Sequence, residues 1–456
     1  MASLLAATQL LAAAPADVPL LAVAPFVLLL LSIAVLPIVA HHWWESNRNR
    51  GIVAAALAGP VALWLLVGPA HGVHWLAHAG LEYAAFLALL GSLFVITGGI
   101  HVGGALAGTP AVNTAVLGVG AAIASIVGTT GASMLLIRPL LRANAGRARK
   151  AHLVVFFIFV VSNAGGLLTP LGDPPLFLGF LRGVPFDWTL RLWGPWLFVN
   201  GALLAVFYGF DRVMVRREPP TTAASDAGPR ARLRLDGKLN FLWLLGVVLT
   251  SLVVGTVSRQ QGWSQEVRDG ALVLGMVAMA VLSLVTTPAG VRPANKFSWA
   301  PIVEVAVIFA GIFVTMVPAM KLLDVMGAEG RIALTEPWQY FWVTGALSAF
   351  LDNAPTYVTF ATIACGVVGR ATGVPIDPSS LDRLAADPTG AAYLAAISCG
   401  AVFLGAGTYI GNGPNFMVKA IAEENGVKMP SFFGYVVWSA AILVPVLLAL
   451  TFVSFR

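Results

Sequence analysis

Long apolar stretches separated by short polar segments run through most of the chain. Four examples of about 17–25 residues are Val18–Ala40, Ile52–Pro69, Leu239–Gly255 and Phe433–Phe455. A helix needs about 20 such residues to cross the roughly 30 Å of hydrocarbon in a bilayer. The pattern therefore predicts an all-α polytopic membrane protein and excludes a soluble globular domain.

Two strongly basic segments set the orientation that we expect in the membrane. Arg138–Lys150 contains five Lys or Arg residues, and Arg212–Lys238 contains seven. Because basic residues are enriched in the cytoplasmic segments of membrane proteins, we place both segments in the cytoplasm and the protein in the cell (inner) membrane. The second segment also contains Pro219, Pro220 and Gly228, a composition typical of a linker.

The apolar stretches can then be traced as two halves of opposite topology. Residues 112–141 must begin and end inside, and residues 338–364 must begin and end outside, so we expect two re-entrant hairpins. Inverted repeats of this kind are typical of secondary transporters, whose sites lie where the repeats meet. The expected organisation is a tail and first span at 1–50, a first inverted repeat at 51–211, a linker at 212–238 and a second inverted repeat at 239–456.

The first 17 residues end in Ala-Ala-Pro-Ala-Asp, a composition that weakly suggests a signal peptide. They lack its basic beginning, however, and a full-length apolar span follows them. We therefore interpret residues 1–17 as a short exported tail.

One motif occurs in both halves and supports the repeat. Thr169–Phe177 (TPLGDPPLF) aligns with Thr408–Phe416 (TYIGNGPNF), with four identities and two conservative pairs. The shared form is T-x-[LI]-G-[DN]-x-P-x-F. A weaker match aligns Ser125–Ser133 (SIVGTTGAS) with Ser348–Thr356 (SAFLDNAPT), inside the two expected hairpins. Taken together, the two matches indicate that related segments occupy corresponding places in the two halves.

The stretch 162–175 (SNAGGLLTPLGDPP) cannot continue as a regular helix. It places three glycines and three prolines inside an expected crossing segment, and a proline removes a donor and clashes with the preceding turn. Irregular backbone at membrane depth is tolerated only against protein or a water-filled cavity. Freed carbonyls beside Asn and Thr oxygens suit a hard cation such as Na⁺, and half-helix N-termini attract anions. One proline would suffice for a simple kink, so we interpret the stretch as part of a transport site.

Two aspartates lie beside the helix breakers. A carboxylate at the depth expected for Asp173 costs about 2.5 kcal/mol or more, so it should be protonated or paired with a cation during part of a cycle. Asp352 lies in apolar company beside Pro355 in the second hairpin, and the same argument holds for it. The structural alternative is helix capping, because Asp often precedes the first turn of a helix. Both roles can hold together.

We therefore expect the two aspartates to exchange protons for a transported cation, with neutral oxygens from nearby Asn, Ser and Thr side chains. Glu304, inside the apolar stretch 299–320, is a candidate proton relay. No cofactor and no structural metal are expected, because Cys365 and Cys399 form no metal-binding pattern. The candidate transport residues are Asp173, Asp352, Asn163, Thr169, Asn353, Asn412, Thr408, Ser162, Thr129 and Thr130.

Composition agrees with the membrane interpretation. The 456 residues are 58% hydrophobic and 11% charged, whereas a soluble domain has about 25% charged residues. The net charge of +6 does not indicate a nucleic-acid partner, because the basic residues lie between the spans. The expected partners are the lipid bilayer and small ions.

At these motifs the chain resembles the ion transporter superfamily, specifically its NhaD-type sodium/proton antiporters and the related citrate transporters. The resemblance rests on SNAGG (162–166), TPLGD (169–173) and SAFLDNAP (348–355), and it extends over most of the chain from about residue 50. It implies a set of scaffold helices, two re-entrant hairpins and two broken helices, usually in a homodimer.

One departure from the antiporters matters. The resemblance implies an Asp-Asn pair in the first hairpin, where this chain has Thr129 and Thr130. The substitution lowers the number of carboxylates in the site. It also makes the hairpin tip more similar to the hydroxyl-rich tips of carboxylate carriers in the same superfamily.

Two transport hypotheses follow, and an enzyme is disfavoured. The leading one is antiport of Na⁺ or Li⁺ against protons; the alternative is Na⁺- or proton-coupled transport of citrate or a dicarboxylate. A polyanion needs positive charge, and near the two motifs the chain offers Arg182 and Lys419. Leu171-Gly172-Asp173 is similar to the Gly-Asp signature of an intramembrane aspartyl protease, but such an enzyme would have no use for the repeated motif at Asn412.

Overall fold

The computed structural model describes residues 18–456, apart from residues 45, 105–106, 219–233, 330 and 332–333. Almost all of this part of the chain is helical, and ten helical segments in it are long and apolar enough to cross a membrane. The protein is therefore an all-α polytopic membrane protein, with one short strand pair. The expected tail at 1–17 and the centre of the linker lie outside the described residues.

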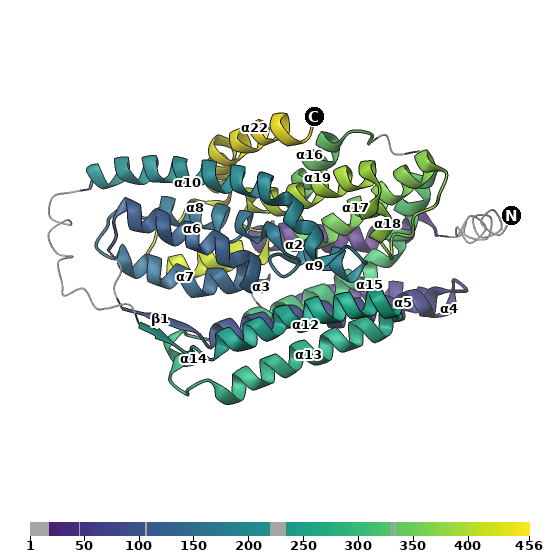
Figure 1. Cartoon of the computed structure of the whole chain (residues 1–456), viewed down its shortest axis with the longest axis horizontal. Helices are drawn as coiled ribbons and strands as arrows, with labels where there is room; N and C mark the ends of the chain where they lie inside the picture. The colour runs from purple at the N-terminus through teal and green to yellow at the C-terminus, as the bar shows by residue number, and fades with distance from the viewer. Residues whose placement is uncertain (1–17, 45, 105–106, 219–233, 330, 332–333) are drawn as a thin grey trace.

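The helices pack in two layers (Figure 1). The lower layer in that view, which we call the scaffold layer, holds helices that are apolar around most of their surface. Small residues allow α4 and α15 to approach and run parallel, because Gly51 faces Val307 and Gly311 faces Ala54. The scaffold layer consists of α4 (Asn47–Val67), α5 (Gly72–Gly98), α12 (Asn240–Gln261), α13 (Gln265–Thr286) and α15 (Ala300–Ala328), and α2 (Ala24–Val39) packs against α4 and α15.

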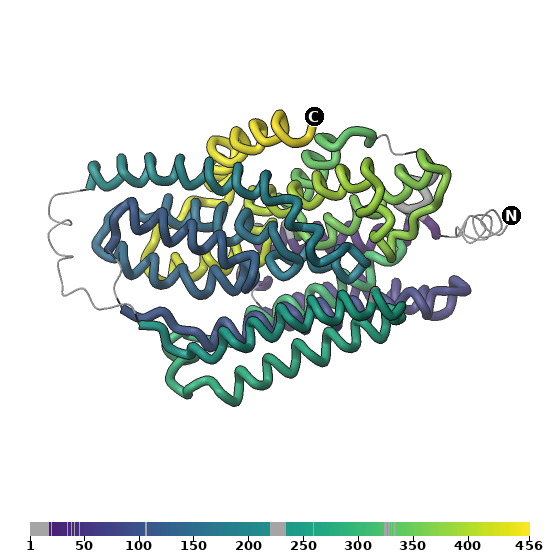
Figure 2. Tube along the Cα trace, in the orientation of Figure 1, coloured from purple at the N-terminus to yellow at the C-terminus, as the bar shows by residue number. Residues whose placement is uncertain are grey.

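The second layer, which we call the site layer, contains the hairpins and the broken helices. Helices of the first half and helices of the second half lie side by side in it (Figure 2). Its first-half members are α6 (Pro110–Val127), α7 (Thr129–Ala143), α8 (Ala151–Val160), α9 (Pro174–Leu181) and α10 (Trp193–Arg216). Its second-half members are α16 (Pro337–Ser348), α17 (Asn353–Thr372), α19 (Pro388–Leu404), α20 (Gly413–Glu424), α21 (Phe432–Trp438) and α22 (Val444–Ser454).

Short elements complete the two layers. The small helices are α3 (His41–Trp44), α14 (Val291–Ala294) and α18 (Asp382–Ala386), and the 3-10 turns are η1 (Leu20–Val23), η2 (Ala164–Leu168), η3 (Phe186–Leu192) and η4 (Gly405–Gly407). A π-helical turn, η5 (Ser439–Leu443), separates α21 from α22.

Both expected hairpins form two helices joined by a sharp turn. The first turn is at Gly128, whose φ of +79° is a conformation that favours glycine. The base of the first hairpin lies beside the C-terminal end of α10, where Asn113 hydrogen-bonds to Asp211. The chain that follows the second hairpin instead meets the end of α9, where Leu381 N donates to Arg182 O at 2.5 Å. The two hairpins therefore enter the site layer from opposite ends.

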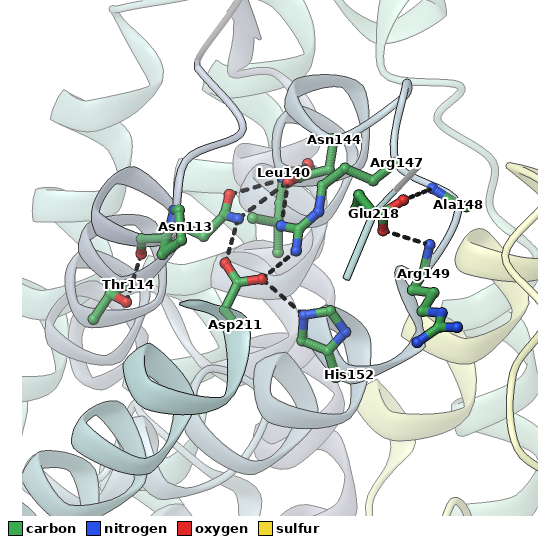
Figure 3. Close-up of polar contacts among 11 residues, drawn as sticks. Asn113, Thr114, Leu140, Asn144, Arg147, Ala148, Arg149, His152, Asp211 and Glu218 are labelled. Carbon is green, nitrogen blue, oxygen red and sulfur yellow. Dashed lines mark hydrogen bonds and ion pairs between the residues drawn. The ribbon is translucent and has the colours of Figure 1, made fainter. Parts of the chain in front are cut away.

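A buried polar network holds the base of the first hairpin (Figure 3). Asp211 on α10 accepts from Asn113 Nδ2 at 2.9 Å, from Arg147 Nη2 at 2.5 Å and from His152 Nε2 at 2.8 Å. Asn144, at the end of α7, exchanges hydrogen bonds with Asn113. One carboxylate thus ties the hairpin and the start of α8 to α10.

The two basic segments meet at one end of the molecule. Strand β1 (His101–Gly103) pairs antiparallel with β2 (Arg234–Asp236), which lies at the end of the linker. Arg142 donates to a backbone carbonyl of β1, and Glu218 accepts two backbone amides of the segment 138–150. Their shared location is what a common cytoplasmic side requires; the side of the membrane on which they lie stays a prediction.

Candidate transport site

The two broken helices are interrupted in the same way. In the first, α8 ends at Val160, the 3-10 turn η2 follows, and α9 starts after Asp173. In the second, α19 passes into η4 and α20 starts after Asn412. The glycines of the motif are required here, because a Cβ on Gly172 would lie 2.0 Å from Gly166 O.

Equivalent threonines anchor both interruptions to the hairpins. Thr169 Oγ1 donates to the carbonyl of Ser125, and Thr408 Oγ1 donates to the carbonyl of Ala349. Each hydroxyl also accepts the backbone amide two residues later, at 3.2 Å. These hydroxyls hold the backbone in shape, a role that differs from the cation contacts we expected from them.

The hydrogen bonds of Thr169 and Thr408 show that the two hairpins align one residue away from the alignment based on sequence. Because Ser125 and Ala349 play equivalent roles, Thr129 corresponds to Asn353, the first residue of α17. The sequence alignment had paired Thr129 with Asp352. It was wrong by one position because it matched two serine side chains, whereas the equivalence lies in the backbone carbonyls that accept the bonds.

Asp173 lies where both halves of the chain meet. Its carboxylate is 2% exposed. Oδ1 accepts from Thr129 Oγ1 at 2.9 Å and from Asn412 Nδ2 at 3.1 Å, and Oδ2 accepts from Asn353 Nδ2 at 2.6 Å. The donors come from the first hairpin, the second broken helix and the second hairpin. Four of the ten predicted residues therefore lie in direct contact around one carboxylate.

One oxygen beside Asp173 has no donor. Asn353 is fully buried, its amide nitrogen is bonded to Asp173, and its Oδ1 has no hydrogen-bond partner in the structure. A buried acceptor without a donor costs about 1–3 kcal/mol. The pair of a carboxylate and an unpartnered amide oxygen is suited to a hard cation, which prefers oxygen ligands.

Asp352 caps a helix. Its Oδ1 accepts from Ala354 N at 3.1 Å, which caps the N-terminus of α17. Among the described residues, no hydrogen bond joins its side chain to Asp173. The capping alternative is therefore present, and the transport role of Asp352 stays a prediction.

Ser162 and Asn163 form a second row behind the Asp173 contacts. Asn163 Oδ1 accepts from Asn412 Nδ2 at 3.1 Å, and Asn163 Nδ2 donates to Asn415 Oδ1 at 2.7 Å. The Ser162 hydroxyl bonds to that of Ser133 at 2.8 Å. This row orients the amide that reaches Asp173.

Thr130 and Glu304, the last two candidates from the sequence, form no hydrogen bond or ion pair with Asp173 in the described part of the chain. Thr130 follows Thr129 on α7 and is only partly buried. Glu304 forms an ion pair with Arg50 at 3.0 Å between α15 and α4 of the scaffold layer. Among the described residues no hydrogen bond or ion pair connects Glu304 to the Asp173 contacts, and its role as a proton relay stays a prediction.

Sequence reasoning missed Asn415 and Ser125. Asn415 Nδ2 donates to the freed carbonyls of Gly405 and Thr408, and Ser125 Oγ donates to that of Gly165. Trp196 donates to the same Gly165 carbonyl. The carbonyls of Gly165, Gly405 and Thr408 thus have protein donors. The available signal was Asn415 itself, a polar residue where the first copy of the motif has leucine.

The contacts of Asp173 thus join segments from both halves of a membrane protein. A model of the family described as "Putative citrate transport" matches residues 15–455. The chain belongs to this family. The match covers both hairpins, both broken helices and the scaffold layer, and membership of the family makes the protein a membrane transporter. It favours the citrate transporters over the NhaD-type antiporters. No curated protein matches the chain significantly.

Proposed function

We propose that this protein is a secondary active transporter for a carboxylate of the citrate class, coupled to Na⁺ or H⁺ that binds at Asp173. The family match supports the substrate class. The observation that carries the coupling is the buried Asp173 carboxylate, which receives donors from both halves and lies beside the unpartnered Oδ1 of Asn353.

Electrostatics makes the coupling obligatory. In the described part of the chain, no Lys or Arg forms an ion pair with Asp173. Two like charges about 4 Å apart repel by about 4 kcal/mol at an effective dielectric constant of 20. A carboxylate substrate can therefore approach only after a cation or a proton has neutralised Asp173. The cation or proton therefore binds first, and the carboxylate substrate binds second.

The helix ends supply the attraction for the anion. Four helices begin at or beside the residues that contact Asp173: α7 at Thr129, α9 at Pro174, α17 at Asn353 and α20 at Gly413. A helix N-terminus carries a partial positive charge that favours anions. Once Asp173 is neutral, these ends can bind a carboxylate although no Lys or Arg of the described residues forms an ion pair with Asp173.

Uptake into proteoliposomes tests this proposal. Labelled citrate is supplied with and without an inward Na⁺ gradient, and with and without a pH gradient. We expect uptake that depends on one of the two gradients and that Asp173→Asn abolishes. Asp187→Asn, the same change at an exposed position, should leave uptake unchanged. Citrate uptake that is independent of both gradients, or that persists in Asp173→Asn, would overturn the proposed coupling.

Antiport of Na⁺ or Li⁺ against protons is the second candidate. The specific observation in its favour is that the described contacts of Asp173 are all uncharged hydrogen-bond donors. A fluorescent pH dye inside the vesicles separates the two functions. Na⁺-driven proton movement without any carboxylate, unaltered by added citrate, would support antiport. Movement that requires citrate would support the carboxylate transporter.

A further inference from the structure

A second cluster of charged side chains lies where α9 ends. Helix α9 starts beside Asp173 and has eight residues, so its C-terminal end lies about 12 Å from its start at 1.5 Å per residue. Arg182 follows it directly and is 7% exposed. The cluster lies where the end of α9 meets Glu82 of α5.

Arg182 is bonded across the two layers. Its Nε and Nη2 donate to the two carboxylate oxygens of Glu82 on α5, at 2.9 and 3.0 Å. Among the ion pairs of the described residues, this one alone joins the site layer to the scaffold layer. The guanidinium fork is planar and has a third nitrogen, and here Nη1 has only a long contact of 3.4 Å to Pro378 O.

A cavity of about 80 Å³ opens beside this ion pair. Its lining includes Trp75, His78, Glu82, Arg182, Lys321 and Ser379. A cavity needs about 10–15 Å³ of this kind of volume to hold one water molecule, so this cavity has room for a carboxylate group. The rest of a tricarboxylate would extend toward the open side of the cavity.

The charges of this cavity do not cancel. Arg182 and Lys321 are positive and Glu82 is negative, which leaves one positive charge when His78 is neutral. Lys321 Nζ lies 5.1 Å from the centroid of the Trp75 ring. In the described residues no carboxylate forms an ion pair with Lys321. An uncompensated ammonium group on the wall of a cavity inside a membrane protein favours an anionic ligand.

We propose that this cavity is a second anion site, which captures one carboxylate group of the substrate before the substrate reaches Asp173. Lys321 Nζ and the Nη1 edge of Arg182 hold the group, while Glu82 keeps the other edge of the guanidinium oriented. The inference rests on the proposed function as a carboxylate transporter.

A cysteine placed in the cavity tests its occupancy directly. Both native cysteines are buried, so in Ser379→Cys the new thiol is the reactive one. Ser379 hydrogen-bonds through its backbone amide, to Asp377 Oδ1, so the substitution should leave the loop intact. We expect citrate to slow labelling of this thiol by a charged maleimide. Ser298→Cys, at an exposed position outside the cavity, should label at the same rate with and without citrate.

Lys321→Gln then identifies the residue that holds the anion. We expect it to remove the protection of Ser379→Cys and to raise the citrate KM of uptake about tenfold, the size of one charge-assisted hydrogen bond, with the maximal rate unchanged. Lys321→Arg should restore both, and the exposed Lys428→Gln should change neither. Unaltered labelling of Ser379→Cys in citrate, or protection that persists in Lys321→Gln, would overturn the second site.

The two readouts separate this inference from the proposed function. Citrate uptake without protection of Ser379→Cys contradicts the cavity site and leaves carboxylate transport standing. Protection that depends on Lys321, in a protein that does not take up citrate, supports the anion site and contradicts carboxylate transport.

Discussion

At the level of single residues, the Asp173 carboxylate shows what a sequence can reveal. An aspartate among three glycines and three prolines in an apolar segment could be singled out as a candidate, because an isolated carboxylate there is costly, and in the structure it is buried among donors from both halves. Asn415 and Ser125 could not be recognised in the same way. Their value depends on which backbone carbonyls the broken helices leave free, and that is decided by the three-dimensional path of the chain.

Thr129 and Thr130 provide a test at this scale. Thr129 Oγ1 donates to Asp173, whereas the side chain of Thr130 forms no hydrogen bond within the described part of the chain. Thr129→Val keeps the volume and removes the donor. We expect Thr129→Val to change the apparent Na⁺ or H⁺ affinity of transport by about tenfold, the effect of about 1–1.5 kcal/mol. Cation titrations of citrate uptake in proteoliposomes measure it.

Thr130→Val is the matched control for that experiment. We expect it to leave the cation affinity unchanged, since α7 turns its side chain away from the Asp173 contacts that Thr129 makes. An effect of Thr130→Val as large as that of Thr129→Val would contradict the one-residue change in the alignment of the hairpins.

At the level of elements, the hairpins and broken helices could be predicted, and the contacts between distant elements could not. The expected hairpin at 112–141 corresponds to α6 and α7, and the one at 338–364 corresponds to α16 and α17, although α17 continues to Thr372. The positions of glycines, prolines and basic segments were enough to predict these hairpins and broken helices. The Asp211 network joins residues 98 and 64 positions apart, and no local pattern indicates such pairs.

Asp211→Asn tests whether this network holds the first hairpin. The substitution leaves the Arg147 guanidinium buried without a carboxylate, which typically costs about 3–5 kcal/mol. We expect a clear fall in the thermal unfolding temperature of the purified protein. Asp187→Asn, at an exposed position, should unfold like the unaltered protein. An unchanged unfolding temperature in Asp211→Asn would contradict the anchoring role.

At the level of the whole molecule, the arrangement concentrates the polar links between layers at one place. Leu181 O, the last carbonyl of α9, accepts from Arg268 and Gln265 of α13, and the Arg182 side chain binds Glu82 of α5. The other end of α9 holds Asp173. In alternating access one bundle moves against another around the site, so a movement of the site layer must break or rebuild these links. Helix α9 therefore connects the state of the site to the contact between the layers.

A charge exchange between Glu82 and Arg182 tests this connection. Each single change, Glu82→Arg or Arg182→Glu, places two like charges in a buried contact. We expect each to lower citrate uptake strongly and to reduce thermal stability, because breaking a buried pair costs about 3–5 kcal/mol. The double variant restores opposite charges on the same two helices. Uptake and unfolding temperature, measured for all four proteins, give the coupling between the two positions.

The pattern of recovery identifies what the ion pair does. Recovery of both stability and uptake in the double variant means that the pair acts by attraction between the two layers. In that case it does not matter which layer holds the positive charge. Recovery of stability alone means that the guanidinium is required on α9 itself, as a binding group for the substrate carboxylate. Full additivity of the two single effects, with no recovery of either quantity, would contradict an interaction between Glu82 and Arg182 in the working transporter, because residues that do not interact show additive changes.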